Sequence, residues 1–203
     1  FSGVSKLAPG HLIEVQPGGK IQPVAFSSLP APKDTRHKSA DDARAELASL
    51  LDEAVRIRMS ADVPVGALLS GGLDSSAIVA IMRHHATGGR LKTFSLGFSE
   101  ESHDERAYAA KVAQHFETEH HEIEMSGDLN GLLHKVSWHF DEPFADASAL
   151  STMCVSALAR KEVTVVLTGD GGDEAFMGYP RYDVCHASEW IRKLPACMRS
   201  SAA

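Results

Sequence analysis

The stretch VPVGALLSGGLDSS, residues 63–76, joins an apolar run to a glycine-rich loop and then to the start of a helix pattern. The run over 63–69 is too short for a typical helix and suits a buried strand. Gly71 and Gly72 allow a sharp turn and let the backbone approach a ligand without an intervening Cβ. The helix pattern over 75–85 offers unpaired N–H groups and a positive dipole end, which together bind anions. The stretch therefore predicts a strand, an anion-binding loop and a helix in succession.

Strand and helix patterns alternate through the rest of the chain. Strand patterns cover 91–98, 119–125 and 163–167, and helix patterns cover 104–116, 129–139 and 147–161. This alternation predicts an α/β fold, a doubly wound and mostly parallel sheet with helices on both faces. In such sheets the ligand lies beyond the carboxyl ends of the strands, so the loops that follow the strands are the candidate site.

The amino-terminal part has a different pattern. Two short strand-like runs within residues 11–25 flank Pro17-Gly18-Gly19 and predict a β-hairpin. Residues 27–38, with two prolines and mixed charges, predict a linker. A helix is expected over 39–59, capped by Ser39 and with an apolar series at the helical period, namely Ala43, Leu47, Leu50 and Ala54. We therefore expect a hairpin and linker over 1–38 and the main domain over 39–203.

A second glycine-rich loop, TGDGGDE at residues 168–174, follows the last predicted strand. It carries three carboxylates within five positions, Asp170, Asp173 and Glu174. Such crowding is costly unless a cation is shared. The first loop lacks the lysine of the GxxxxGK[ST] motif, and its Asp74 would repel a bare phosphate. A Mg²⁺ ion between Asp74 and the phosphates resolves this conflict. The alternatives are a plain glycine turn with a serine cap and a solvated acidic loop.

Composition excludes several classes of function. The chain has 203 residues, 43% of them hydrophobic, and a formal net charge of −7. This balance argues against nucleic-acid binding and against an anionic membrane surface, and no apolar run is long enough to span a bilayer. Three cysteines without a CxxC pair predict reduced thiols in the cytoplasm. Neither His84-His85 nor His120-His121 is expected to share a metal ion, because adjacent side chains point apart.

The two loops together resemble those of the asparagine synthase family. SGGLDSS at 70–76 is similar to the pyrophosphate loop of ATP pyrophosphatases that make acyl-adenylates, and the acidic second loop makes the likeness specific. The likeness is collinear from about residue 7 to residue 182. Further segments carry it, namely TFSLGF at 93–98, EHHE at 119–122, DEPFAD at 141–146 and GYPRY at 178–182.

The resemblance implies an adenine nucleotide alpha hydrolase-like fold that uses ATP and Mg²⁺. It implies pyrophosphate contacts from the first loop, including Ser70, Gly71, Gly72, Asp74 and Ser75. It places Leu68, Leu96, Thr168 and Gly169 around the adenosine, with Asp74 and Asp173 as Mg²⁺ ligands. Asp170 would lie beside the reaction centre, at a position that family members often fill with glutamate. Gly72 is expected where a side chain would strike the phosphate or where φ is positive.

The implied activity is amide formation by a cytoplasmic ligase. A carboxylate, aspartate in the first instance, would become an acyl-adenylate with loss of pyrophosphate, and glutamine-derived ammonia would attack it. The family's glutaminase domain and the downstream segment with a catalytic lysine do not appear in this sequence, so we expect a truncated synthetase domain that is inactive by itself. The alternatives are an amidotransferase for another carboxylate and a nucleotide-binding fragment without turnover.

Overall fold

The computed structural model describes residues 2–19, 21–28, 39–98, 104–125, 129–142, 144–146 and 148–192. The chain divides into two compact units, Phe1–Glu46 and Leu47–Ala203. Within the described residues, every helix is too short or too polar to cross a membrane.

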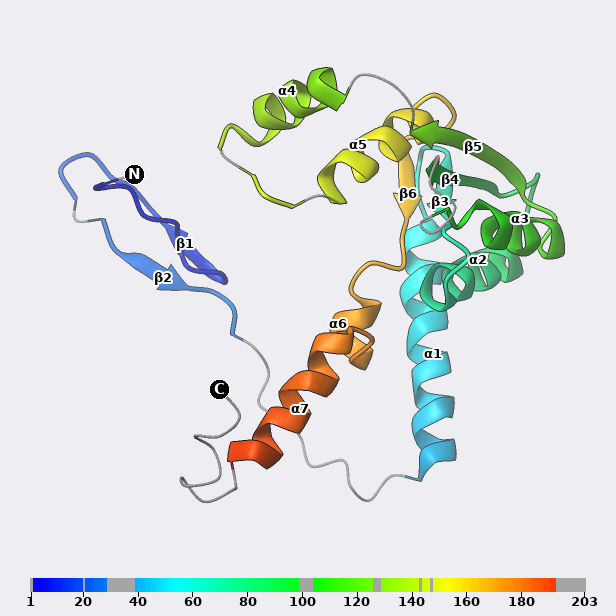
Figure 1. Ribbon diagram of the computed structural model, residues 1–203, viewed down its shortest axis with the longest axis horizontal. Helices are drawn as coiled ribbons and strands as arrows, with labels where there is room; N and C mark the ends of the chain where they lie inside the picture. The colour runs from blue at the N-terminus through cyan, green and yellow to red at the C-terminus, as the bar shows by residue number, and fades with distance from the viewer. Residues whose placement is uncertain are drawn as a thin grey trace. The chain divides into compact units, whose positions relative to one another are not determined.

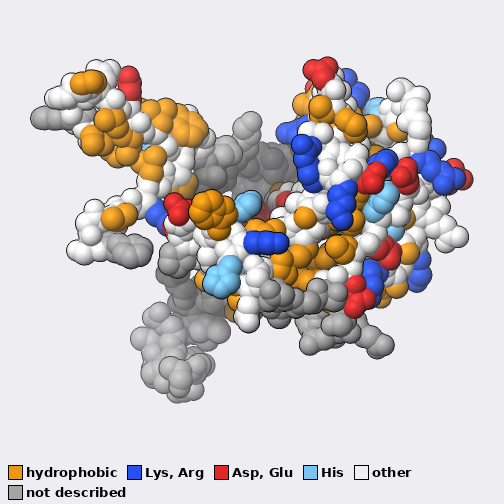
Figure 2. Space-filling view, turned by 90° about the horizontal axis from the view of Figure 1, so that it is seen from above, with side chains coloured by type: hydrophobic (Ala, Val, Ile, Leu, Met, Phe, Trp, Pro, Cys, Tyr) orange, Lys and Arg blue, Asp and Glu red, His pale blue; other side chains and the backbone are white. Residues whose placement is uncertain are grey.

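The first unit contains the predicted hairpin. Strands β1 (His11–Ile13) and β2 (Pro23–Ala25) pair antiparallel. The N–H groups of Phe26 and Ser27 both donate to the Gly10 carbonyl, which closes the open end of the hairpin. Its apolar side chains are largely exposed, as Figure 2 shows at its left. The expected linker lies mostly outside the described residues, from 29 onward.

Helix α1 (Ala40–Met59) begins where its cap predicts. The Asp42 N–H donates to Ser39 Oγ at 3.1 Å, and Ser39 Oγ donates to the Asp42 carboxylate at 2.7 Å. The helix packs on the core near its carboxyl end, through Val55 and Met59. Leu50, which belongs to the expected apolar series, is 56% exposed. The helix is therefore confirmed, and the expected series matches its packing face in part, because Leu47 and Ala54 are half-buried whereas Ala43 and Leu50 are exposed.

The second unit is built on a four-stranded sheet (Figure 1). Its strands are β3 (Val65–Leu68), β4 (Lys92–Phe98), β5 (Glu119–Met125) and β6 (Val165–Leu167). All pairs are parallel, in the order β5-β4-β3-β6. The chain thus moves outward from β3 to β5 and then returns to place β6 on the other side of β3. The reversal creates a switch point between the ends of β3 and β6, where ligands of such sheets bind.

Helices cover both faces of this sheet, as predicted. Helices α2 (Leu73–His85) and α3 (Arg106–His115) cover one face, α5 (Ser148–Ala159) covers the other, and α4 (Leu129–Phe140) packs beside α5. One core joins α1, α2 and α3 to the sheet around Leu69, Val79 and Met82. The other joins α5 to the sheet around Phe94 and Val155. The two cores establish the doubly covered parallel sheet.

Two further helices were not predicted from the sequence. They are the short α6 (Gly172–Phe176) and α7 (Pro180–Arg192). Between them, Met177 has a left-handed backbone conformation with φ 60°. Proline suits the first position of α7 because its missing N–H would have no helical partner there. Helix α6 starts inside the second glycine-rich loop.

Candidate functional site

A cavity of about 550 Å³ lies at the carboxyl ends of β3 and β6. Residues of both glycine-rich loops and of α6 line it. Its walls include every predicted site residue except Gly71 and Leu96, namely Leu68, Ser70, Gly72, Asp74, Ser75, Thr168, Gly169, Asp170 and Asp173. The two loops, far apart in the sequence, therefore form one site at the switch point of the sheet.

Leu96 lines an adjacent cavity of about 240 Å³. Leu68 and Ser70 line both cavities, so the two cavities adjoin. Together they are a candidate site for one elongated ligand. The smaller cavity also has walls that the sequence did not indicate, in particular Glu105, Ser151 and Thr152. Glu105 precedes α3, and the other two lie on α5. No local motif distinguishes them from ordinary helix residues, because only the packing of α3 and α5 beside β4 brings them to the site.

Gly71 has a packing role. Its φ is +85°, a conformation that other residues rarely adopt, and a Cβ there would lie 2.5 Å from the Ala109 nitrogen. Gly72 has φ −67°, and the nearest atom to its Cβ position is Ser70 Oγ at 3.3 Å. Of the two alternatives expected for Gly72, the positive φ is wrong, because the loop turns at Gly71 instead, and the contact with a phosphate stays a prediction.

Hydrogen bonds between serines brace the first loop. Ser70 Oγ and Ser75 Oγ are 2.9 Å apart, and the Gly72 N–H donates to Ser70 Oγ at 3.2 Å. Ser75 Oγ also donates to the Gly72 carbonyl at 3.3 Å. Ser76 Oγ is buried without a partner among the described atoms, and Ser76 does not line the cavity. The serines therefore hold the shape of the loop.

The amino end of α2 opens at the cavity. Gly72 is the N-cap residue, and no side chain caps the helix there. Uncapped N–H groups and the positive end of the helix dipole favour an anion at this position. With thirteen residues, α2 is long enough for its dipole to contribute.

The second loop lies directly against Asp74. A Cβ at Gly172 would overlap the Asp74 carboxylate, and a Cβ at Gly169 would lie 2.7 Å from the Ser75 nitrogen. Gly171 turns the loop with φ +89°, and the Asp170 N–H donates to Thr168 Oγ1 at 3.2 Å. Close contact between the two loops therefore depends on glycines that carry no side chain.

The residues present fit a magnesium ion. Asp74 and Asp173 line the same cavity, and in the described part of the chain neither they nor Asp170 forms an ion pair. Mg²⁺ is commonly held by one or two carboxylates together with substrate phosphates. The site thus offers carboxylate oxygens that no cationic side chain among the described residues neutralises.

Glu174 is engaged differently from the other acids of the second loop. The Tyr179 hydroxyl donates to its carboxylate at 3.0 Å, and this hydrogen bond, together with burial, raises the pKa of Tyr179. The Arg181 guanidinium lies 4.1 Å from the centre of the Tyr179 ring. The GYPRY segment therefore holds Glu174 away from the cavity, whose walls do not include it.

Asp146, in the DEPFAD segment, caps α5. Its carboxylate accepts the Ser148 N–H at 2.9 Å and the Ser148 hydroxyl at 2.7 Å, and these hydrogen bonds lower its pKa. A larger cavity of about 1050 Å³ lies beside α4 and α5, with mostly apolar walls that include Trp138 and Phe144. No predicted site residue lines it, and we assign it no part in nucleotide binding.

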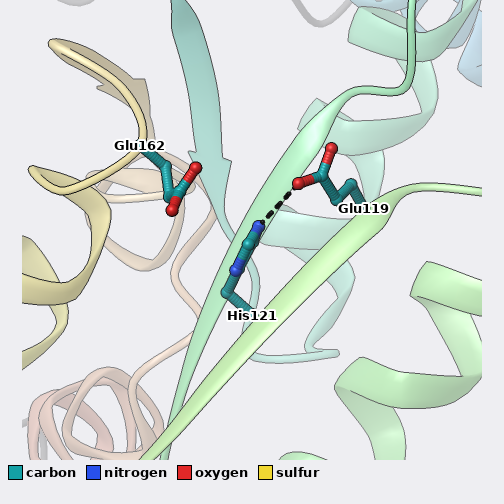
Figure 3. Close-up of side chains that lie close together, drawn as sticks. All are labelled: Glu119, His121 and Glu162. Carbon is teal, nitrogen blue, oxygen red and sulfur yellow. Dashed lines mark hydrogen bonds and ion pairs between the residues drawn. The ribbon is translucent and has the colours of Figure 1, made fainter.

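A second cluster of ionisable groups lies at the amino ends of the strands, away from the cavity. Glu119, His121 and Glu162 have ligand atoms within 4.8 Å of one another, and Figure 3 shows His121 bonded to Glu119. The Lys92 ammonium reaches Glu162 at 2.5 Å and Glu119 at 3.5 Å. These contacts raise the pKa of Lys92 and lower that of Glu162. The cluster thus already contains its cation and forms a structural ion-pair network.

The adjacent His120 and His121 lie on opposite faces of β5. His120 Nδ1 and Thr93 Oγ1 are 2.8 Å apart, whereas the His121 ring stacks on Phe94 with centroids separated by 5.3 Å. The two side chains therefore point apart, as the geometry of a strand predicts for adjacent residues. Desolvation by burial lowers the pKa of His120, although Glu122 opposes this effect.

The sheet order and the paired loops define a doubly wound parallel α/β domain with a cavity at its switch point. Residues 46–202 match the sequence model of the Asparagine synthase family, and the chain belongs to that family. It is 50% identical over 151 residues to a Methanocaldococcus jannaschii protein provisionally named asparagine synthetase [glutamine-hydrolyzing] 2, over 74% of this chain and 29% of the relative.

Two other relatives extend the match. Asparagine synthetase [glutamine-hydrolyzing] 1 of Bacillus subtilis is 35% identical over 88% of this chain and 28% of its own length. Amidase chry2 of Gibberella zeae is 30% identical over 98% of this chain and 32% of its own length. The chain therefore spans about a third or less of the length of these relatives.

Proposed function

We propose that residues 39–203 belong to the ATP-dependent synthetase domain of an amide-forming ligase, with residues 1–38 leading into it. The domain would activate the side-chain carboxylate of aspartate as an acyl-adenylate. A glutaminase domain of the same parent protein would supply ammonia from glutamine. The observation that carries the proposal is the single cavity in which both glycine-rich loops meet. The names of the relatives support the choice of aspartate and of glutamine as nitrogen source.

The nucleotide would lie across the two adjoining cavities. Its adenosine would occupy the smaller space beside Leu68 and Leu96, where apolar walls suit a purine ring. Its phosphates would lie over the first loop and the amino end of α2, with Thr168 and Gly169 at the border. Asp74 and Asp173 would hold Mg²⁺. The ion, when bound, neutralises charge on the departing pyrophosphate.

The reaction would proceed in two steps, adenylation of the carboxylate and attack by ammonia. A carboxylate oxygen of the acceptor attacks the α-phosphorus of ATP while the bond to the β-phosphate oxygen breaks, which releases pyrophosphate. The nitrogen of ammonia then attacks the acyl carbon, AMP leaves with the electrons of the C–O bond, and a proton is lost to solvent. Loop N–H groups and the helix dipole stabilise the developing phosphate charge, so the protein contributes mainly positioning and electrostatics. Asp170 lines the cavity and would lie near the acceptor.

Product analysis of the full-length parent protein tests this proposal. We expect AMP and pyrophosphate in equal amounts, together with aspartate-dependent exchange of labelled pyrophosphate into ATP. Release of ADP and phosphate would reject the assignment. Exchange that depends on another carboxylate and not on aspartate would retain the chemistry but replace the acceptor. The same exchange assay on the 203-residue chain tests the expectation that this chain does not turn over alone.

A further inference from the structure

Gly178 follows helix α6 at the rim of the proposed nucleotide cavity. Its N–H donates to the Asp173 carbonyl at 3.0 Å, a bond that closes the carboxyl end of the helix. The left-handed position of this helix end is filled by Met177, with φ 60°. Gly178 itself does not have a positive φ. The backbone therefore does not require a glycine at position 178.

The Asp173 side chain does require it. A Cβ built on Gly178 would overlap Asp173 Oδ1 and would lie 3.0 Å from Asp173 Cγ. The nearest backbone atom, Asp173 Cα, would be 3.3 Å away, a distance that a small adjustment relieves. An added methyl group would thus displace the end of the aspartate side chain and leave the helix backbone nearly in place. Asp173 and Gly178 line the same cavity, so the displacement would occur inside the site.

We infer that Gly178 is a positioning residue. Because it has no side chain, the Asp173 carboxylate can keep the orientation in which it would bind the nucleotide-bound metal. The inference rests on the proposed function, because it takes Asp173 as a metal ligand. The surface of a glycine lets the carboxylate lie against the chain after α6, and any larger residue would turn it. A carboxylate that must meet a small octahedral ion has little tolerance for such a turn.

Metal titration of the full-length protein tests this inference without turnover. Mn²⁺ replaces Mg²⁺, α,β-methylene-ATP replaces ATP, and water-proton relaxation reports the ternary complex. We expect Gly178→Ala to raise the half-saturating Mn²⁺ concentration on the order of tenfold. Substitution of a residue that orients a metal ligand usually weakens metal binding by about this factor. Met177→Gly is the matched control from the same helix end, and we expect it to leave Mn²⁺ binding unchanged.

A double-variant cycle isolates the contact. In the Asp173→Ala background no carboxylate remains to be displaced, so adding Gly178→Ala should change neither Mn²⁺ binding nor Tm further. An equal effect of Gly178→Ala in both backgrounds would assign Gly178 to the helix end and overturn the inference. Normal Mn²⁺ binding by Gly178→Ala, alongside weakened binding by Asp173→Ala, would overturn the inference about Gly178 and leave the metal assignment of Asp173 in place. Normal binding by Asp173→Ala would reject the metal assignment of the proposed function, and the inference with it.

Discussion

Alanine at each of the two adjacent glycines of the first loop should separate stability from ligand binding. At Gly71, alanine must adopt φ +85° and place its Cβ 2.5–2.6 Å from backbone atoms of Tyr108 and Ala109. The left-handed conformation costs about 1–2 kcal/mol and overpacking about 1–3 kcal/mol, and reduced freedom of the unfolded chain returns under about 1 kcal/mol. We expect Gly71→Ala to lower the free energy of unfolding of this domain by about 3 kcal/mol, which for a domain of about 200 residues is a Tm decrease of roughly 6–12 °C.

Gly72→Ala should behave in the opposite way. The backbone there suits any residue, and the nearest atom is the movable Ser70 Oγ, so stability should change by less than about 1 kcal/mol. The new methyl group would enter the cavity, and we expect MgATP affinity to fall on the order of tenfold, about 1.4 kcal/mol. Urea denaturation and calorimetry on the full-length protein measure the two effects. A large stability loss in Gly72→Ala with intact affinity would refute the assignment of this loop to phosphate binding, and an unperturbed Gly71→Ala would refute its packing role.

Three other predictions concern charge, packing and pH. Asp74→Asn should lower the turnover of the full-length protein on the order of 10²-fold, the cost of losing one preorganised charged group, and near-normal turnover would leave Asp74 as a turn residue. Phe94→Ala should cost about 3–5 kcal/mol in urea denaturation, because the ring is fully buried between the sheet and α5; a loss below 1 kcal/mol would contradict that packing. Burial lowers the pKa of His120 below its ordinary value of 6.5, so the unfolded chain takes up a proton first as the pH falls. The contribution of His120 to stability should be complete above pH 6.5 and decline below it, through the lowered pKa of the folded state. Denaturation between pH 5 and 8 should show a smaller slope for His120→Gln, and an unchanged slope would exclude His120 as the titrating group.

Much of the second unit could be predicted because its signals are local. Each strand of the sheet is a short apolar or alternating run that ends at turn residues, and the loops that follow β3 and β6 are visible as glycine-rich segments. The rule that ligands bind where such a sheet reverses direction then brings both loops to one cavity, as the structure confirms. The roles of the individual residues remain predictions.

The features that escaped prediction depend on tertiary contacts. The sequence does not show which of Gly71 and Gly72 has the positive φ, because a glycine at either position permits the turn. Only the close approach of α3 to Gly71 distinguishes the two positions. The packing face of α1 is set by where α2 and the sheet reach it, near Val55. Glu105 and the α5 residues of the smaller cavity carry no motif at all. Helix α7 was missed because its sequence is mostly polar, although its few apolar residues recur at a helical period.

The return of the chain to β3 also has a consequence for the order in which the protein assembles. Strand β3 joins β4 through Ala67 and Thr93, 26 residues apart, but joins β6 through Val65 and Val165, 100 residues apart. Closing the longer loop costs about 1.2 kcal/mol more in chain entropy, so β6 should dock after the β3-β4-β5 layer has formed. The cavity then forms only with this last pairing. During synthesis, residues beyond 168 must therefore leave the ribosome before the domain can bind a nucleotide. ATP added during refolding should therefore leave the rates of the early folding phases unchanged. It should slow only the unfolding step in which β6 separates from β3.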